Sequence, residues 1–279
     1  MLIIGSHLSI ANGLYSAVLD AISIGANTFQ FFTRNPRGGK ARDLDIVEIN
    51  RACKLMKEYG FGPIVAHGSY TMNLASEKKQ TREFAKMILK DDLERIKLIP
   101  NAYYVFHPGS HVGQGIEKGI DLIVEALNEA IDENNNTVIL LEGMSGKGTE
   151  IGGNLKELKE IIDGVKYNKN IGICIDTCHL YSAGYDIVND LDGVIKEIDD
   201  IIGLERLKAV HLNDSKTEFN SRKDRHEVIG KGKIGLEAIV NVINHPSLKG
   251  LPFNLETPND LEGYKKEIEI LRKEYKWIA

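Results

Sequence analysis

Short apolar runs alternate with longer amphipathic stretches along the whole chain. The short runs are rich in β-branched and aromatic residues and are bounded by turn-forming residues, which is typical of buried β-strands. The longer stretches repeat apolar residues every three or four positions, which predicts helices, for example over residues 44–60 and 115–135. We expect strands at LIIGSH from residue 2, NTFQFF from 27, GPIVAHG from 62, AYYVFHPG from 102, TVILLEG from 137, IGICIDTCH from 171, LKAVHLND from 207 and LPFNLET from 251.

This alternation predicts an α/β protein, because strands that are each followed by a helix pair in parallel through right-handed crossovers. Eight such units within 279 residues fit a closed (β/α)8 TIM barrel, for which roughly 250 residues is typical. A doubly wound open sheet is the alternative that the pattern alone leaves open. No linker rich in Pro, Gly or Ser divides the chain, so we expect a single domain over residues 1–279.

The third to eighth predicted strands each end in a side chain that can bind a metal ion. In a closed barrel the carboxyl ends of all strands surround one cavity, so these side chains should converge from different directions. A lone histidine at a strand end is more often structural, but a run of six such residues is hard to explain in that way. The six are His67, His107, Glu142, Asp176, His211 and Glu256.

Two short motifs add three more donors. His179 follows Asp176 by three residues in DTCH, and DRH brings Asp224 and His226 together in a long irregular stretch over residues 213–235. Loops of that length inside a compact domain tend to be functional. Imidazole and carboxylate ligands without a thiolate suit zinc, and also manganese or iron. Nine donors exceed what one tetrahedral ion needs and fit two or three ions that share carboxylates.

Polynuclear sites of this kind serve the hydrolysis of phosphate esters, since one ion lowers the pKa of a bound water while another neutralises the leaving oxygen. The sequence contains no G-x-S-x-G motif and no convincing Cys–His pair, which agrees with water as the attacking group. Its glycine-rich segments, KGTEIGG and GKGKIG, lack the spacing of dinucleotide or P-loop motifs. We therefore expect no nucleotide cofactor.

The net charge of −5 argues at first against a nucleic-acid partner. Three bound divalent cations would add six positive charges, turning the total of −5 to +1 and concentrating positive charge in one cleft. Two loops on the face where the donors converge are also rich in the side chains that contact phosphates. They carry Arg34, Arg37, Lys40 and Arg42 after the second strand, and Lys216, Arg222, Lys223, Arg225, Lys231 and Lys233 after the seventh.

We expect a cytoplasmic protein that does not contact membranes. The first residues are apolar, but they lack a basic leader and are interrupted by His7, Asn12 and Gly13, unlike a signal peptide. No apolar stretch approaches the roughly 18–20 residues that cross a bilayer. The chain has three cysteines, Cys53, Cys174 and Cys178, and they form no CxxC motif. We therefore expect buried, reduced thiols.

Seven segments together resemble the endonuclease IV family of apurinic/apyrimidinic (AP) endonucleases: HGSYTMNLA, FHPGSH, LLEGMSGKGTEIG, CIDTCHLYSAGYD, VHLNDSK, KDRHEVIGKGKIG and NLETP. The resemblance implies a TIM barrel with a trinuclear zinc site. Such an enzyme cuts double-stranded DNA on the 5′ side of an abasic sugar, leaving a 3′-hydroxyl and a 5′ deoxyribose phosphate, and also removes blocking groups from 3′ ends. We expect a monomer that binds Zn²⁺, with Mn²⁺ or Fe²⁺ as alternatives at some sites.

The resemblance also assigns roles to the candidate residues. Three zinc ions would bind, in order, to His67, His107 and Glu142; to Glu142, Asp176, His211 and Glu256; and to His179, Asp224 and His226. Glu142 would thus bridge two ions that share the attacking hydroxide. Arg37 and Tyr70 match the positions that enter the DNA where the abasic nucleotide is flipped out. His7 and His111, near the ends of the first and fourth strands, are candidates to orient the ligands.

The chain departs from the more familiar family pattern in two places. Thr71 stands where an apolar wedge often follows the tyrosine, and Gly143-Met144-Ser145 replaces the common Asn-Thr-Ala after the bridging glutamate. The main alternative function is a metal-dependent sugar isomerase or epimerase on the same type of barrel, which needs fewer ligands. A non-catalytic DNA-binding or scaffold protein is the other alternative, but it would have no use for nine donors.

Overall fold

Eight parallel strands form the centre of the protein in a computed structural model that describes residues 1–276. The last three residues of the predicted domain, 277–279, lie outside the described part. The strands follow the order β1-β12-β9-β8-β6-β4-β3-β2. Their bounds are β1 Ile4–Ser6, β2 Gln30–Phe32, β3 Ile64–His67, β4 Ala102–Phe106, β6 Val138–Glu142, β8 Ile171–Asp176, β9 Leu207–His211 and β12 Phe253–Leu255.

The two ends of this sheet meet, so the sheet is a nearly closed barrel and not the doubly wound alternative. A parallel bridge joins His7, just after β1, to Gln30 at the start of β2. The backbone N–H of Leu8 donates to the Gln30 carbonyl at 2.7 Å across the same seam. All eight predicted strands are therefore confirmed, and with them the (β/α)8 barrel.

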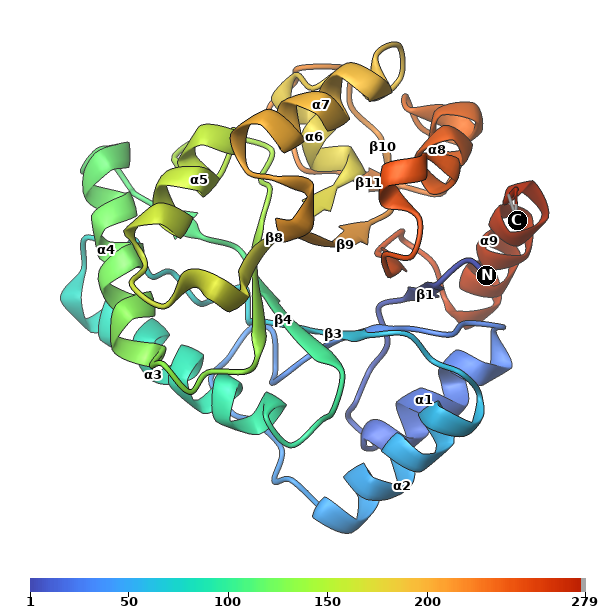
Figure 1. Ribbon diagram of the computed structural model, residues 1–279, viewed down its shortest axis with the longest axis horizontal. Coiled ribbons are helices and arrows are strands. Elements are labelled where there is room, and N and C mark those ends of the chain that lie inside the picture. The colour runs from blue at the N-terminus through green and yellow to red at the C-terminus, as the bar shows by residue number, and fades with distance from the viewer. Residues whose placement is uncertain (277–279) are drawn as a thin grey trace.

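Helices surround the barrel, and one follows each strand (Figure 1). None of those between residues 1 and 276 is long and apolar enough to cross a membrane. Two short paired segments, β5 Gly109–Ser110 with β7 Glu150–Ile151 and β10 Asp214–Ser215 with β11 His226–Glu227, tie loops together beyond the barrel strands. The helices are α1 Leu14–Ser23, α2 Ile46–Glu58, α3 Lys79–Ile96, α4 Ile116–Ala130, α5 Leu155–Gly164, α6 Thr177–Ala183, α7 Leu191–Ile201, α8 Gly235–Asn244 and α9 Leu261–Glu274.

The predicted helices are confirmed, with ends set by local chemistry. Helix α2 begins after Asp45, whose carboxylate accepts the backbone N–H groups of Val47 and Glu48. Helix α4 stops at Ala130, five residues before the end of the predicted stretch, because Ile131 takes an extended backbone. The apolar repeat in the sequence extends past the end of the helix because Ile131 is also buried, although it lies outside the helix.

Alternate residues of the strands belong to two separate apolar clusters. The larger cluster joins the outward-facing strand residues to the helices. The smaller one contains only inward-facing residues of five neighbouring strands, and these fill the barrel: Val65, Val105, Leu140, Cys174 and Ala209. This layer forms a dry floor beneath the carboxyl ends of the strands, so anything that binds there rests on a packed core.

One residue of the predicted basic loops has a structural role instead. Arg34 is buried, and its guanidinium donates to Asp92 of α3 at 2.5 and 3.0 Å and to Asp91 at 2.6 Å. It also donates to the Gly39 carbonyl at 2.7 Å. Its expected place among the phosphate-binding side chains is therefore wrong. Instead, Arg34 clamps the loop after β2 to helix α3.

Removing Asp92 should destabilise the protein strongly. The Asp92 side chain is fully buried, so Asp92→Ala leaves the Arg34 guanidinium buried with only the partly exposed Asp91 as a carboxylate partner. We expect the free energy of unfolding to fall by about 3–5 kcal/mol, the usual cost of breaking a buried ion pair. Equilibrium urea denaturation would measure it.

Asp91→Ala is the matched control, because the Asp91 side chain is 51% exposed and contacts the same guanidinium. Exposed pairs contribute about 1 kcal/mol or less. Equal losses for the two variants would contradict the assigned clamp.

Candidate metal centre

The alternation of side chains along a strand places the candidate donors. His67, Glu142, Asp176 and His211 are the last residues of β3, β6, β8 and β9. Each stands two positions after a residue of the barrel-filling cluster, so its side chain points to the same inner side. The same spacing relates His107 to Val105. The strand geometry therefore brings these donors together above the barrel floor.

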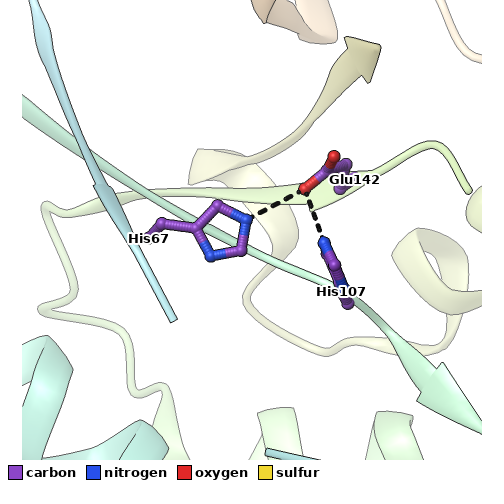
Figure 2. Close-up of side chains that lie close together, drawn as sticks. All are labelled: His67, His107 and Glu142. Atoms are coloured by element: carbon purple, nitrogen blue, oxygen red, sulfur yellow. Dashed lines mark hydrogen bonds and ion pairs between the residues drawn. The ribbon is translucent and has the colours of Figure 1, made fainter. Parts of the chain in front are cut away.

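The first group of donors comes from three neighbouring strands. His67 Nε2 and His107 Nε2 lie 3.1 and 3.3 Å from one oxygen of the Glu142 carboxylate, Oε2 (Figure 2). The Nδ1–H of His67 donates to the Gly68 carbonyl at 2.6 Å, which turns Nε2 toward the centre. All three side chains belong to one group that could hold a metal ion.

The second group lies around the other oxygen of the Glu142 carboxylate, Oε1. Glu142 Oε1 lies 3.0 Å from His211 Nδ1, which in turn is 3.5 Å from Glu256 Oε2. Asp176 completes this group, in which all donor atoms lie within 4.8 Å of one another. Glu142 thus faces two groups with two different oxygens, which is the geometry of a bridging ligand.

The third group lies on the long loop and on helix α6. The Asp176 carboxylate caps α6 by accepting the backbone N–H of His179 at 2.9 Å. This cap places the His179 ring, whose Nε2 is 3.4 Å from Asp224 Oδ1, while His226 Nε2 is 3.3 Å from the same oxygen. His226 Nε2 also lies 3.5 Å from Asp176 Oδ2. Asp176 therefore stands between the second and third groups.

Two buried atoms test whether this arrangement fits metal ions. His179 Nε2 and His226 Nε2 have no hydrogen-bond partner among residues 1–276, although both face the Asp224 carboxylate. A buried nitrogen without a partner is costly unless something else satisfies it. A cation between these two rings and the carboxylate would do so. The residues present therefore fit a metal site.

Cys178 lies near the third group but does not suit it chemically. Its sulfur could join Asp224 and His226 in a further candidate group. Burial raises the pKa of the Cys178 thiol to about 11, and the thiol donates to the Arg225 carbonyl at 3.7 Å. Because a metal binds the thiolate, a thiol held in this state is a poor ligand.

The donors hold opposite charges close together inside the protein. Burial raises the pKa of Glu142, but the neighbouring His211 and His107 outweigh it, so this pKa lies well below its usual range. Burial lowers the pKa of His179, but Asp176, Asp224 and Glu142 together raise it well above its ordinary value. In the metal-free centre these shifts favour an ionised Glu142 and a protonated His179.

The pKa values of His211 and His107 are raised for the same reason. Burial lowers the pKa of His211, but the surrounding groups, with Glu256 and Glu142 among them, raise it well above normal. For His107, Glu142 outweighs burial and raises the pKa. The raised pKa values favour protonated His107 and His211 in the metal-free protein, and their positive charges balance the neighbouring carboxylates.

Sequence reasoning missed three supporting residues, and only one of them, Gln30, carries a sequence signal, a polar residue within an apolar strand. The buried carboxylate of Asp214 accepts backbone N–H groups at 2.9–3.3 Å from residues 230, 232, 234 and 235, and so folds the loop that carries Asp224 and His226. Asn213 donates to Asp176 at 2.7 Å and accepts the backbone N–H of Glu256 at 2.8 Å. The third is Gln30, whose amide contacts Glu256 at 2.5 Å and His211 at 2.6 Å.

The two residues proposed for DNA contact lie on linked loops beside the donors. Tyr70 is 59% exposed, and its ring centroid lies 5.7 Å from that of His107. Arg37 is exposed on the loop after β2, which Ser69 joins to the Tyr70 loop by donating to the Pro36 carbonyl at 3.0 Å. The hydroxyl of Thr71 hydrogen-bonds to that of Ser69 at 2.8 Å.

Of the two histidines expected to orient ligands, one lies beside a candidate ligand and the other does not. His7 Nδ1 lies 3.7 Å from Glu256 Oε1, beside the second group. His111 instead accepts the backbone N–H groups of Gly113 and Gly115, both at 3.3 Å, and shapes its own loop. The expectation for His111 is wrong, because the chain turns away from the centre after Pro108 and Gly109 pairs with β7.

The fold and the clustered donors define a class, the TIM-barrel proteins with a metal-binding centre at the carboxyl ends of their strands. The sequence model of the family described as "Xylose isomerase-like TIM barrel" matches residues 18–274. A D-tagatose 3-epimerase-like protein of known structure shares the fold, with a TM-score of 0.73 and 21% identity over 97% of this chain and 96% of that one. This likeness extends to the fold alone.

Closer relatives narrow the class. The chain is 57% identical to "Probable endonuclease 4" of Alkaliphilus oremlandii (strain OhILAs), over 99% of this chain and 98% of that protein. The crystal structure of endonuclease IV from Thermus thermophilus superposes with a TM-score of 0.85, at 36% identity over 97% of this chain and 98% of the other. The chain belongs to the endonuclease IV family. Family membership implies metal dependence, in agreement with the donor groups.

Metal binding should release protons at neutral pH. The histidines whose pKa values are raised carry protons in the metal-free protein, and a metal binds only the neutral imidazole. The apparent metal affinity should therefore rise with pH until it passes the raised pKa values, and level off above them. Titration calorimetry with Zn²⁺ at pH 7, in buffers of different ionisation enthalpy, would count the protons. Uptake of protons, or none exchanged, would contradict this account of the centre.

Proposed function

We propose that this protein is a DNA-repair endonuclease that hydrolyses the phosphodiester bond 5′ to an abasic site, leaving a 3′-hydroxyl and a 5′ deoxyribose phosphate. The observation that carries the proposal is the Glu142 carboxylate, whose two oxygens face two separate groups of metal donors. Membership in the endonuclease IV family gives the reaction class. Removal of blocking groups from 3′ ends is proposed for the same centre.

The centre would hold three zinc ions, with Mn²⁺ or Fe²⁺ as alternatives at some positions because imidazole and carboxylate ligands accept all of them. When bound, these ions would supply an activated water and neutralise charge on the phosphate. The ions would be held by His67, His107 and Glu142; by Glu142, Asp176, His211 and Glu256; and by His179, Asp224 and His226.

The loops beside the centre would select the substrate. The Tyr70 ring is exposed and held by edge contact with Phe32, 4.9 Å between centroids, so it can stack in the gap of a duplex without losing its support. Arg37 would meet the phosphate backbone from the loop that Arg34 clamps. A nucleotide without a base flips at little cost, because its pairing is already lost.

A sugar isomerase or epimerase remains the alternative to test, since proteins of that kind share the barrel. The third donor group argues against it, because isomerisation has no evident use for His179, Asp224 and His226 as additional ligands. The metal-loaded protein, incubated with a duplex that contains a single tetrahydrofuran residue, should cut the damaged strand on the 5′ side of that residue. An intact duplex together with turnover of a ketose or aldose would overturn the proposal.

Glu142→Gln should separate binding from turnover. The neutral amide loses the charge that would hold two ions, while the DNA-facing loops stay unchanged. We expect kcat to fall more than about 100-fold, since even the partners of metal ligands are worth 10–100-fold. Binding of damaged duplex, measured by fluorescence anisotropy, should change little.

Glu150→Gln is a suitable control, because Glu150 lies after the same strand and its carboxylate accepts only local groups, the Lys147 N–H at 2.9 Å and the Ser145 hydroxyl at 3.2 Å. Near-normal cleavage by Glu142→Gln would refute the bridging role.

Arg37→Ala should weaken DNA binding without changing metal content. Losing one phosphate contact should lower affinity across sequences and reduce the slope of log K against log salt by about one. Lys169→Ala is the control, because Lys169 is exposed just before β8, at the opposite end of the barrel. Equal salt slopes for wild type and Arg37→Ala would rule out the contact.

Two further expectations stay predictions. The monomeric state would be checked by sedimentation of the metal-loaded protein. The cytoplasmic location would be checked by fractionation of the cells that make it.

A further inference from the structure

Gln30 is a fully buried glutamine at the start of β2, and its side chain reaches beneath the second donor group. Its Nε2 lies 2.5 Å from Glu256 Oε1 and 3.0 Å from His7 Nδ1. Its Oε1 lies 2.6 Å from His211 Nε2. One amide thus touches two candidate ligands of the same proposed ion, and both of its N–H groups and its oxygen have partners.

We propose that Gln30 is a positioning residue, which selects the nitrogen that His211 offers to the metal and aims the Glu256 carboxylate at the same ion. This inference rests on the proposed metal centre and deepens it. Gln30 itself touches neither metal nor substrate.

The directions of the hydrogen bonds follow from the chemistry of the partners. A carboxylate only accepts, so the Gln30 NH₂ group must face Glu256, and the amide oxygen must then face His211. That oxygen accepts, so Nε2 of His211 carries a proton and Nδ1, which faces Glu142 3.0 Å away, is the nitrogen left to offer to a metal. The reversed amide would place two acceptors, Gln30 Oε1 and Glu256 Oε1, against each other at 2.5 Å.

A comparison of four histidines of the centre shows why His211 needs a side chain as its hydrogen-bond partner. His67, His179 and His226 each place Nδ1 against a backbone carbonyl and direct Nε2 toward the centre. His211 is turned the other way, with Nδ1 toward the donors and Nε2 toward Gln30. Its orientation therefore depends on an amide that one substitution can remove, whereas the other three depend on the backbone.

The place of Gln30 in β2 gives a second reason to assign it a positioning role. Gln30 pairs in register with Val65, a member of the apolar cluster that fills the barrel. A polar amide at that level must be desolvated, which is costly unless it finds partners. The partners it finds are the ligands just above it and His7, so the cost is offset only if the ligands keep their positions. Groups that hold metal ligands in this way are typically worth 10–100-fold in metal affinity.

The test compares Gln30→Met, which keeps the length of the side chain and removes its hydrogen bonds, with Thr28→Val. Thr28 is a matched control, because it is fully buried two residues earlier and its hydroxyl donates to the Pro63 carbonyl, away from the donors. Zn²⁺ affinity would be measured at each site by competition with a chelator. Long-range ¹H–¹⁵N NMR of the Zn²⁺-loaded protein would report which nitrogen of His211 keeps its proton.

We expect Gln30→Met to bind one of its Zn²⁺ ions at least about tenfold more weakly than wild type, and the proton of His211 to lose its fixed place. Thr28→Val should match wild type in both readouts. Should Gln30→Met fail to fold, Gln30→Glu keeps the acceptor toward His211 and loses the donor toward Glu256. It should then keep the His211 tautomer and lose metal affinity.

Unchanged Zn²⁺ affinity and an unchanged His211 proton in Gln30→Met would overturn the positioning role, and so would an equal loss in Thr28→Val. Failure of the proposed function looks different, because wild-type protein would then bind no Zn²⁺ or leave the abasic duplex uncut.

Discussion

The structure depends on one geometric constraint, the alternation of side chains along the strands of a closed parallel barrel. Each inward-facing apolar residue fixes the direction of the residue two positions later, and at the carboxyl ends those residues are histidines and carboxylates. Closure then makes donors from opposite strands neighbours, as for His67 and His211, whose rings lie 5.9 Å apart. The floor of packed side chains keeps this arrangement rigid.

The same constraint creates an electrostatic problem that shapes the rest of the centre. Carboxylates and imidazoles lie together in a region of low dielectric, where an unpaired charge is costly. In the metal-free protein the pairing comes from protons on the histidines, which is why several of their pKa values are raised. Cations would exchange with those protons, so folding, metal binding and pH are linked through one set of side chains.

Buried polar contacts hold the loops around the centre, together with the short β5–β7 and β10–β11 pairs. Arg34 with Asp92 anchors the loop after β2, and the Asp214 carboxylate gathers backbone N–H groups of the loop after β9. Gln30 extends this principle into the barrel, where it holds two donors from below. Arg37 stays exposed on the loop that Arg34 anchors, and Tyr70 stays exposed beside His67 and His107.

From its sequence alone the chain predicts eight strands, the helices between them and nine candidate donors, because period-two and helical patterns are local properties that depend on which residues must be buried. The pattern alone left a closed barrel and an open sheet as alternatives, and the seam between β1 and β2 decided between them. The sequence could not distinguish Arg34, which is buried in an ion pair, from Arg37, which is exposed, because both are arginines of one loop. Nor could it show that His111 turns away, or that Gln30 supports His211. Those outcomes depend on contacts between residues up to 226 positions apart, such as Gln30 and Glu256, and only the closed fold brings such residues together.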